Sequence, residues 1–106
     1  MKYHNKKVII DGIEFMSSKE GKRYSQLKEM QNKGEITDLK LQVPFILMPS
    51  FNLGKKRYRE MKYIADFVYI KDGQQIVEDT KGYRTEIYKI KKKLMAYIYQ
   101  IEIKES

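Results

Sequence analysis

The sequence predicts a single domain of the α/β or α+β class, in which two helices flank a mixed β-sheet and a short β-hairpin precedes this core. Two observations support the prediction. Short segments alternate apolar and polar residues, as half-buried strands do, whereas two longer segments repeat apolar residues at helical spacing. The 106 residues, 42% of them hydrophobic, are enough for one core without disulfides or a structural metal.

Local signals set the boundaries of the first two elements. In chain order, the expected elements are a hairpin over 8–10 and 13–15, a helix over 18–33, one bent strand or two short ones over 36–48, strands over 61–70 and 75–81, a helix running to about residue 99, and a short strand over 100–104. Asp11-Gly12 favours a two-residue hairpin turn. Ser17 and Glu20 stand at the spacing of a capping box, which marks a helix start, and Gly34 marks its end.

Turn and breaker residues set the remaining boundaries. Pro44 bends or divides the strand that contains it, and Gly54 lies near the tip of the basic loop that follows. The segment 61–70 is apolar on both faces, which indicates a central strand. Asp72-Gly73 turns the chain into the next strand, and Thr85 caps the second helix.

Positive charge is concentrated in two parts of the chain. Lys and Arg number 22 against 14 Asp and Glu, for a net charge of +8. Residues 54–62 contain five basic side chains and one acidic, and residues 81–93 contain six basic and one acidic. Tyrosines lie among these basic residues, and the combination favours a polyanionic partner, most simply nucleic acid. The alternative is a solvated basic face that serves solubility.

Several classes of protein are excluded by what the sequence lacks. It has no cysteine, which rules out disulfides, thiolate catalysis and zinc–sulfur sites. The longest apolar run, 43–48, is too short to cross a bilayer, and the N-terminus has no secretory signal pattern. We therefore expect a soluble intracellular protein without a membrane partner.

The most informative polar residue is Asp66, in the middle of the expected central strand. Alternation places it on one face with Ile64, Val68 and Ile70. A buried carboxylate is costly unless it is paired, hydrogen-bonded or bound to a metal. Asp66 is therefore either a metal ligand or half of a structural ion pair with a nearby Lys or Arg.

Asp79 and Lys81 lie two residues apart on the next expected strand and so share one face of the sheet. If the Asp72-Gly73 hairpin pairs the two strands, Asp66 and Asp79 approach each other. Two neighbouring carboxylates favour a divalent cation, and oxygen ligands favour Mg²⁺ or Mn²⁺ over zinc. Lys81 can orient a water molecule and stabilise charge on a phosphate. The alternative is a surface Asp79–Lys81 pair on an edge strand.

A third carboxylate, Glu20, falls on the apolar stripe of the first helix. It shares that stripe with Tyr24 and Leu27, which are expected to pack on the sheet. Glu20 therefore either joins the acidic group or only caps its helix by accepting a hydrogen bond from the Ser17 N–H.

These residues, in this order, resemble the PD-(D/E)xK nuclease superfamily. The matching elements are Asp66, then Asp79-Thr80-Lys81 after twelve intervening residues, behind a helix that carries Glu20. The superfamily core runs helix, three strands, helix, strand, which is the order predicted above. Ala65 stands where the superfamily motif has proline, and Asp79 takes the less common acidic option.

A closer resemblance covers about residues 8–104. The segments 17–24, 63–67 and 77–82 look like those of small phage proteins in this superfamily, which are regarded as endonucleases similar to Holliday junction resolvases. The resemblance implies a restriction-endonuclease-like core.

The resemblance also implies a catalytic group of Glu20, Asp66, Asp79 and Lys81. Asp66 and Asp79 would bind the catalytic Mg²⁺, with the Thr80 carbonyl as a further ligand. Glu20 would complete the acidic group directly or through water. Lys81 would position the attacking water and stabilise the scissile phosphate.

Basic side chains are expected to hold the DNA backbone without reading its sequence. They are Lys55, Lys56, Arg57, Arg59, Arg84, Lys89, Lys91, Lys92 and Lys93. The second helix carries an apolar arc, which we expect to pack on the sheet, formed by Ile87, Ile90, Leu94, Tyr97 and Ile98. Lys91 lies within this arc, so it either contacts a substrate phosphate or reaches water with its stem on the core.

The sequence therefore predicts an endonuclease, dependent on Mg²⁺ or Mn²⁺, that cuts branched DNA in phage recombination or replication, in the cytoplasm of an infected or lysogenic bacterium. The small chain leaves no room for a separate sequence-reading domain, which favours recognition of DNA shape. Symmetric cutting of a four-way junction requires a homodimer, for which the opening hairpin and residues 44–53 are candidate surfaces. The alternatives are a nucleic-acid-binding module that does not cleave, and a nuclease of linear DNA or RNA.

Overall fold

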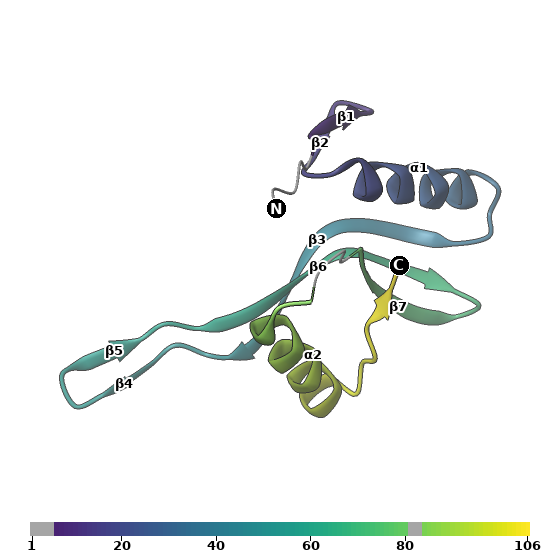
Figure 1. Ribbon diagram of the computed structural model, residues 1–106. Helices are drawn as coiled ribbons and strands as arrows, with labels where there is room; N and C mark the ends of the chain where they lie inside the picture. The colour runs from purple at the N-terminus through teal and green to yellow at the C-terminus, as the bar shows by residue number, and fades with distance from the viewer. Residues whose placement is uncertain (1–5, 81–83) are drawn as a thin grey trace.

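The computed structural model describes residues 6–80 and 84–106, which form a mixed α+β fold as predicted (Figure 1). The elements are β1 (Val8–Ile10), β2 (Ile13–Phe15), α1 (Ser18–Asn32), β3 (Thr37–Met48), β4 (Phe51–Leu53), β5 (Lys56–Tyr58), β6 (Met61–Lys71), β7 (Gln74–Asp79), α2 (Glu86–Tyr99) and β8 (Lys104–Glu105). The main sheet has the order β3-β6-β7-β8, with β8 parallel to β7 and the other pairs antiparallel.

The two helices lie on opposite sides of this sheet, and each covers its own hydrophobic cluster (Figure 1). The buried members of the α1 cluster are Phe15, Tyr24, Leu27, Ile36, Phe67 and Tyr69. Those of the α2 cluster are Leu47, Tyr63, Ala65, Val68, Val77, Tyr88, Met95 and Ile103. The core is therefore divided between the two faces of the sheet.

The first part of the chain folds as its local signals predict. Both residues of the Asp11-Gly12 turn have positive φ, the conformation of a two-residue hairpin turn. The Ser17 side chain accepts a hydrogen bond from the Glu20 N–H at 3.2 Å, and α1 begins there. Gly21 lets the β1–β2 hairpin approach this helix, because a Cβ at Gly21 would lie 2.6 Å from Val8 Cγ2.

Strand β3 reverses its side-chain direction at Gln42. Leu41 packs against the α1 cluster, whereas Val43 packs against the α2 cluster. A regular strand would place these two residues on the same face. Gln42 stands between them with a φ of 53°, in the left-handed region, and so turns the strand over at this point.

The same reversal occurs on β6, so the regular alternation predicted around Asp66 is wrong. Leu41 pairs with Phe67 and Val43 with Ala65, so Gln42 lies opposite Asp66 in the antiparallel register. Ala65 packs in the α2 cluster but Phe67 in the α1 cluster. Asp66 therefore lies where the strand changes face, rather than within one continuous apolar face.

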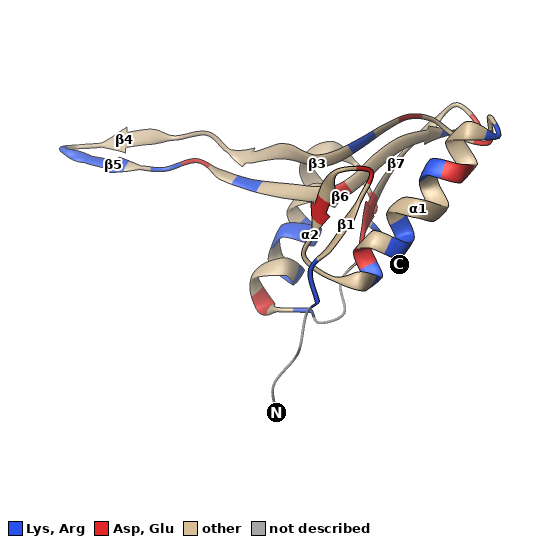
Figure 2. Ribbon diagram, turned by 90° about the horizontal axis from the view of Figure 1, so that it is seen from above, with Lys and Arg blue, Asp and Glu red and all other residues tan. Residues whose placement is uncertain are grey.

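The basic loop predicted around Gly54 forms a two-stranded arm. We define the arm as residues 49–60, which contain β4 and β5. It continues the β3–β6 ribbon away from the body of the protein (Figures 1 and 2). All six residues of β4 and β5 are exposed, so the arm packs little of its surface.

Helix α2 has the predicted bounds but turns a different face to the sheet. The Thr85 side chain accepts from the Tyr88 N–H at 3.0 Å and caps the helix. Tyr88 and Met95 are buried against the sheet, whereas the prediction that the apolar arc packs there is wrong for most of its members. The exposed members are Ile87, Ile90, Tyr97 and Ile98. The spacing of apolar residues did not identify the buried face, because α2 is apolar over about half of its circumference and spacing does not say which part of it the sheet covers.

Two strand boundaries near the C-terminus differ from the prediction. β7 ends at Asp79, and Lys81, where the strand was expected to end, lies outside the described residues. The final strand is limited to Lys104–Glu105, while residues 100–103 lead the chain back from α2 and bury Ile103 in the α2 cluster. Within the described ranges, no helix is long and apolar enough to cross a membrane.

The reversal at Gln42 predicts an unusual order of stabilities. Gly tolerates positive φ, so Gln42→Gly should leave the free energy of unfolding within about 1 kcal/mol of the parent, whereas the β-branched Gln42→Val should lose about 1–2 kcal/mol. Urea denaturation followed by circular dichroism measures both. Lys40→Val, at an exposed position of the same strand, is the control and should change stability by less than about 0.5 kcal/mol. A Gln42→Val variant as stable as Gln42→Gly would contradict the reversal.

Candidate active site

Glu20 and Asp66, two of the predicted site residues, are brought together by Gln42. The Gln42 Nε2 atom donates to Glu20 Oε2 at 3.2 Å and to Asp66 Oδ1 at 3.4 Å. Glu20 comes from the first turn of α1 and Asp66 from the point where β6 changes face. Because β3 reverses at Gln42, this amide lies between the two carboxylates. This role of Gln42 could not be predicted from the sequence, since regular alternation makes it an ordinary polar strand residue.

The second oxygen of Asp66 is held by Thr80. Asp66 Oδ2 accepts hydrogen bonds from the Thr80 N–H at 2.9 Å and from the Thr80 hydroxyl at 3.0 Å. The sequence left open a structural ion pair between Asp66 and a Lys or Arg. Among the described residues, Asp66 is instead hydrogen-bonded to Thr80 and Gln42. Thr80 thus lies beside Asp66 and contacts it through its N–H and hydroxyl, whereas the resemblance implies a metal-binding role for its carbonyl.

Asp79 is oriented toward the α2 cluster. Its side chain is buried, and the Tyr63 hydroxyl donates to Asp79 Oδ2 at 2.7 Å. Burial raises the pKa of Tyr63 above its ordinary value, and the hydrogen bond to Asp79 raises it further, so Tyr63 remains a proton donor. The pairing of Phe67 with Glu78 puts Asp66 and Asp79 at adjacent positions on neighbouring strands.

The three predicted carboxylates are therefore only partly assembled. Within residues 6–80 and 84–106, no group of three acidic, His or Cys side chains is placed to hold a metal ion. Gln42 joins Glu20 to Asp66, whereas Tyr63 draws Asp79 toward the other face. Lys81, which the resemblance implies would position the attacking water and stabilise the scissile phosphate, lies outside the described residues.

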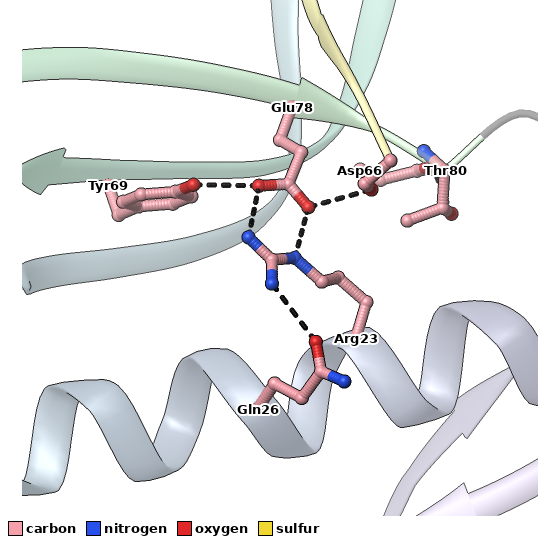
Figure 3. Close-up of polar contacts among 7 residues, drawn as sticks. Arg23, Gln26, Asp66, Tyr69, Glu78 and Thr80 are labelled. Carbon is pink, nitrogen blue, oxygen red and sulfur yellow. Dashed lines mark hydrogen bonds and ion pairs between the residues drawn. The ribbon is translucent and has the colours of Figure 1, made fainter.

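Glu78, next to Asp79, is fully buried on the α1 side of β7 (Figure 3). Arg23 of α1 contacts both of its oxygens, with Nε at 2.5 Å and Nη2 at 3.0 Å. The Tyr69 hydroxyl and the Ser106 hydroxyl donate to it at 2.7 and 2.8 Å. Glu78 thus points away from Asp79 and has a structural contact set of its own.

This contact set shifts the ionisation of its members. Burial alone would raise the pKa of Glu78, but hydrogen bonds from Arg23, Tyr69 and Ser106 outweigh burial and lower it below its ordinary value. The hydrogen bond to Glu78 raises the pKa of Arg23. Burial, together with the hydrogen bond to Glu78, raises the pKa of Tyr69 to about 12. Glu78 is therefore a charged, fully paired carboxylate that fixes α1 to β7.

A cavity of about 270 Å³ opens beside Thr80. It is lined by Lys19, Lys22, Arg23, Gln26, Thr80 and Ser106. Because Arg23 is already paired with Glu78, Lys19 and Lys22 bring the available positive charge. The sequence held a signal for this cavity in the basic residues that surround Glu20 along α1.

The predicted DNA-contacting residues fall into two groups (Figure 2). Lys55, Lys56, Arg57 and Arg59 belong to the arm, whereas Arg84, Lys89, Lys91, Lys92 and Lys93 belong to α2 and the residues before it. Some cations of the second group have acidic partners: Arg84 and Lys92 contact Glu105 at 2.6 and 3.2 Å. Lys91 is half-buried and lines a cavity of about 350 Å³ with Ile64 and Ile87.

The structure thus defines a mixed α+β domain that gathers two acidic side chains beside a cavity with basic side chains. The chain belongs to a family described as a protein of unknown function (DUF1064), whose family model matches residues 1–106. No curated protein and no solved structure matches it. Its function must therefore be argued from the site.

The Arg23–Glu78 pair predicts a large loss of stability when the cation is removed. Arg23→Gln leaves Glu78 buried without its charge partner, which should cost about 3–5 kcal/mol in the free energy of unfolding. Lys22→Gln, at the neighbouring exposed position, is the matched control. Urea denaturation of both variants at pH 7 measures the difference, and equal stabilities would contradict the structural role of the pair.

The same pair predicts an opposite pH dependence in parent and variant. In the parent, the lowered pKa of Glu78 contributes stability above the carboxyl's ordinary value near 4.5, and this contribution is lost as pH falls through the folded-state value. In Arg23→Gln, unpaired burial raises the pKa of Glu78, so its unfavourable contribution should lessen as pH falls from 7 toward 4.5. The gap between parent and variant should therefore narrow in acid, and a gap that widens would contradict this assignment.

Proposed function

We propose that the protein is a divalent-metal-dependent endonuclease that hydrolyses DNA phosphodiester bonds, with a preference for branched DNA. The observation that carries this proposal is the pair of carboxylates, Glu20 and Asp66, that share one amide donor from Gln42. Two carboxylates so close together favour a cation between them. The Gln42 amide, through its partly positive hydrogens, partly offsets the repulsion between the two carboxylates.

The chemistry of the side chains fits Mg²⁺ or Mn²⁺, both of which take oxygen ligands. Glu20 and Asp66 would hold the ion after Gln42 releases them, and Asp79 would join from the adjacent position on β7. The Tyr63 hydroxyl orients Asp79, as outer hydrogen-bond partners commonly do for metal-binding carboxylates. The metal, when bound, activates a water molecule and neutralises charge on the phosphate.

The chain's own residues would then bind and orient the substrate. Lys19 and Lys22 line the cavity beside Thr80, where they can hold a DNA phosphate next to Asp66. Lys81 would position the attacking water and stabilise the phosphate, as the resemblance to PD-(D/E)xK nucleases implies. Arg23 keeps α1 fixed to β7 and so keeps Glu20 near Asp66.

The two basic groups support a DNA substrate bound through its backbone. The arm carries four cations and one acid, and its ribbon extends well beyond the body of the protein (Figure 2). The ion pairs of Arg84 and Lys92 with Glu105 are partly exposed, and such pairs are weak enough to exchange for phosphate contacts. Contacts of this kind read shape and charge rather than sequence, which suits a phage recombination or replication nuclease acting in the bacterial cytoplasm.

Symmetric cutting of a four-way junction needs two such sites, and we propose a homodimer. The exposed apolar arc of α2 supports this, because large exposed apolar patches mark protein interfaces. Its members Ile87, Ile90 and Tyr97 are spaced three and seven residues apart, which suits packing against another helix.

A second candidate function is a basic nucleic-acid-binding module that does not cleave. The observation that favours it is the hydrogen bond from Tyr63 to Asp79, which turns this carboxylate away from Glu20 and Asp66. On this alternative, Asp66 would serve only to hold Thr80.

A cleavage assay separates these functions. The parent protein is incubated with a labelled four-way junction and with linear duplex of the same sequence, in Mg²⁺, in Mn²⁺ and in EDTA. We expect paired, metal-dependent cuts near the junction centre. Asp66→Asn should slow them at least about a hundredfold, because a lost metal ligand forfeits several kcal/mol of transition-state stabilisation.

Asp72→Asn is the matched control, since it makes the same substitution on the β6–β7 hairpin and Asn-Gly retains the turn. It should cut at the parent rate. If linear duplex is cut at the same rate as the junction, the proposal of a nuclease stands and the proposed preference for branched DNA is wrong. Tight binding without cutting in either metal would overturn the enzyme in favour of the binding module.

The homodimer is tested by light scattering. The parent should have twice the 12.7 kDa mass of one chain at micromolar concentration. Ile90→Glu places a charge in the proposed interface and should raise the dimer dissociation constant more than about a hundredfold. Lys93→Glu introduces the same residue on the same helix, outside the apolar line, and should leave the dimer intact. A monomeric parent under conditions of junction cutting would contradict the homodimer.

A further inference from the structure

The arm has a construction that its basic charge does not explain. A two-stranded hairpin by itself is at best marginally stable in water. Here the Phe51 and Tyr58 rings stack across the ribbon, with centroids 4.9 Å apart and planes inclined by 11°. Even so, Leu53 at the tip is 69% exposed. A solvated basic loop needs none of these apolar side chains.

The two faces of the arm differ in chemistry. Phe51 pairs with Tyr58 and Leu53 with Lys56, so these four side chains share one face of the ribbon. The Lys56 amine lies 5.1 Å from the Tyr58 ring centroid. Asn52 and Arg57 form the opposite pair and carry the polar face. One face can therefore stack on flat apolar groups while the other contacts charged or polar ones.

We propose that the arm inserts at the branch point of DNA, where Leu53 and the Phe51–Tyr58 stack cover an exposed base pair. Lys55, Lys56 and Arg57 hold the surrounding phosphates. The arm thereby supplies the preference for branched over linear DNA. This inference rests on the proposed function, because it names the part of the protein that recognises that substrate.

The charge of the arm favours DNA over a second copy of the chain. Its cations, Lys55, Lys56, Arg57 and Arg59, are opposed by Glu60 as its single acidic residue. A second copy would bring the same basic arm, and two such arms would repel each other, whereas phosphates attract the arm. A two-stranded ribbon is also narrow enough to enter a groove of duplex DNA.

The apolar face explains why a branch is preferred. In a continuous duplex each base pair is stacked on both sides, so an inserted side chain must first separate two pairs. At a branch point, pairs next to the opening can present a free face. Apolar and aromatic side chains bind such faces well, and each stacked base is worth roughly a tenfold or greater change in affinity.

Binding measurements in EDTA test the arm without cleavage. Fluorescence anisotropy gives the affinities of the parent and of Leu53→Ser for a four-way junction and for linear duplex of the same sequence. Leu53→Ser should weaken junction binding about tenfold and duplex binding less than about twofold. Ile9→Ser is the matched control, because Ile9 is 73% exposed on the distant hairpin, and it should change neither affinity.

A second readout reports the contact itself. A fluorescent base analogue placed beside the branch point should change its emission when the parent binds and should change much less with Leu53→Ser at saturating protein. Arg57→Ser, on the polar face, should weaken junction and duplex binding by similar factors, because phosphate contacts are common to both.

Other results would overturn the inference. If Leu53→Ser changes both affinities by the same factor, so that the junction preference of the parent is unchanged, branch recognition by the arm is ruled out. Conversion of a parent dimer to a monomer by Leu53→Ser would instead identify the arm as a protein contact. If the parent binds neither DNA, the proposed function fails too. If the parent cuts junctions and Leu53→Ser has the same preference for junction over duplex as the parent, only this inference fails.

Discussion

The structure depends on one backbone constraint, the reversal of β3 and β6 at Gln42 and Asp66. Leu41 and Phe67 face α1, whereas Val43 and Ala65 face α2, because the left-handed conformation of Gln42 inverts the pleat between them. Each half of the long ribbon therefore buries a different face. A short chain can in this way cover both sides of its sheet with only two helices and still have strand length left over for the arm.

The reversal also determines where polar groups can lie within an apolar sheet. Asp66 is half-buried between the fully buried Ala65 and Phe67, and its carboxylate meets an amide from β3 and the Thr80 N–H, so its burial costs little. The buried Arg23–Glu78 pair holds α1 against β7 and keeps Glu20 within reach of that amide. The acidic site is thus a consequence of the same irregularity that divides the core.

The elements that could be predicted from the sequence are those specified locally. Asp11-Gly12, Ser17 and Thr85 act through turn and cap geometry within four residues: the turn has the predicted conformation, and the Ser17 and Thr85 side chains cap their helices. The reversal could not be predicted, because Gln has no preference for the left-handed region and its conformation is imposed by packing on both sides. The exposed face of α2 and the turning of Asp79 toward Tyr63 depend on the same tertiary packing.

The proposed function requires an acidic site to act on a polyanionic substrate. In the proposed function, Glu20, Asp66 and Asp79 would repel phosphates, so other groups must hold the DNA against that repulsion. The cations that can do so are displaced from the carboxylates: Lys19 and Lys22 on α1, one group on the arm and one on α2. In the proposed complex their attraction would act over many phosphates, whereas the acidic side chains would act on one. A chain with a net charge of +8 can therefore hold Glu20 and Asp66 together through Gln42 while its basic side chains lie on the arm and the helices.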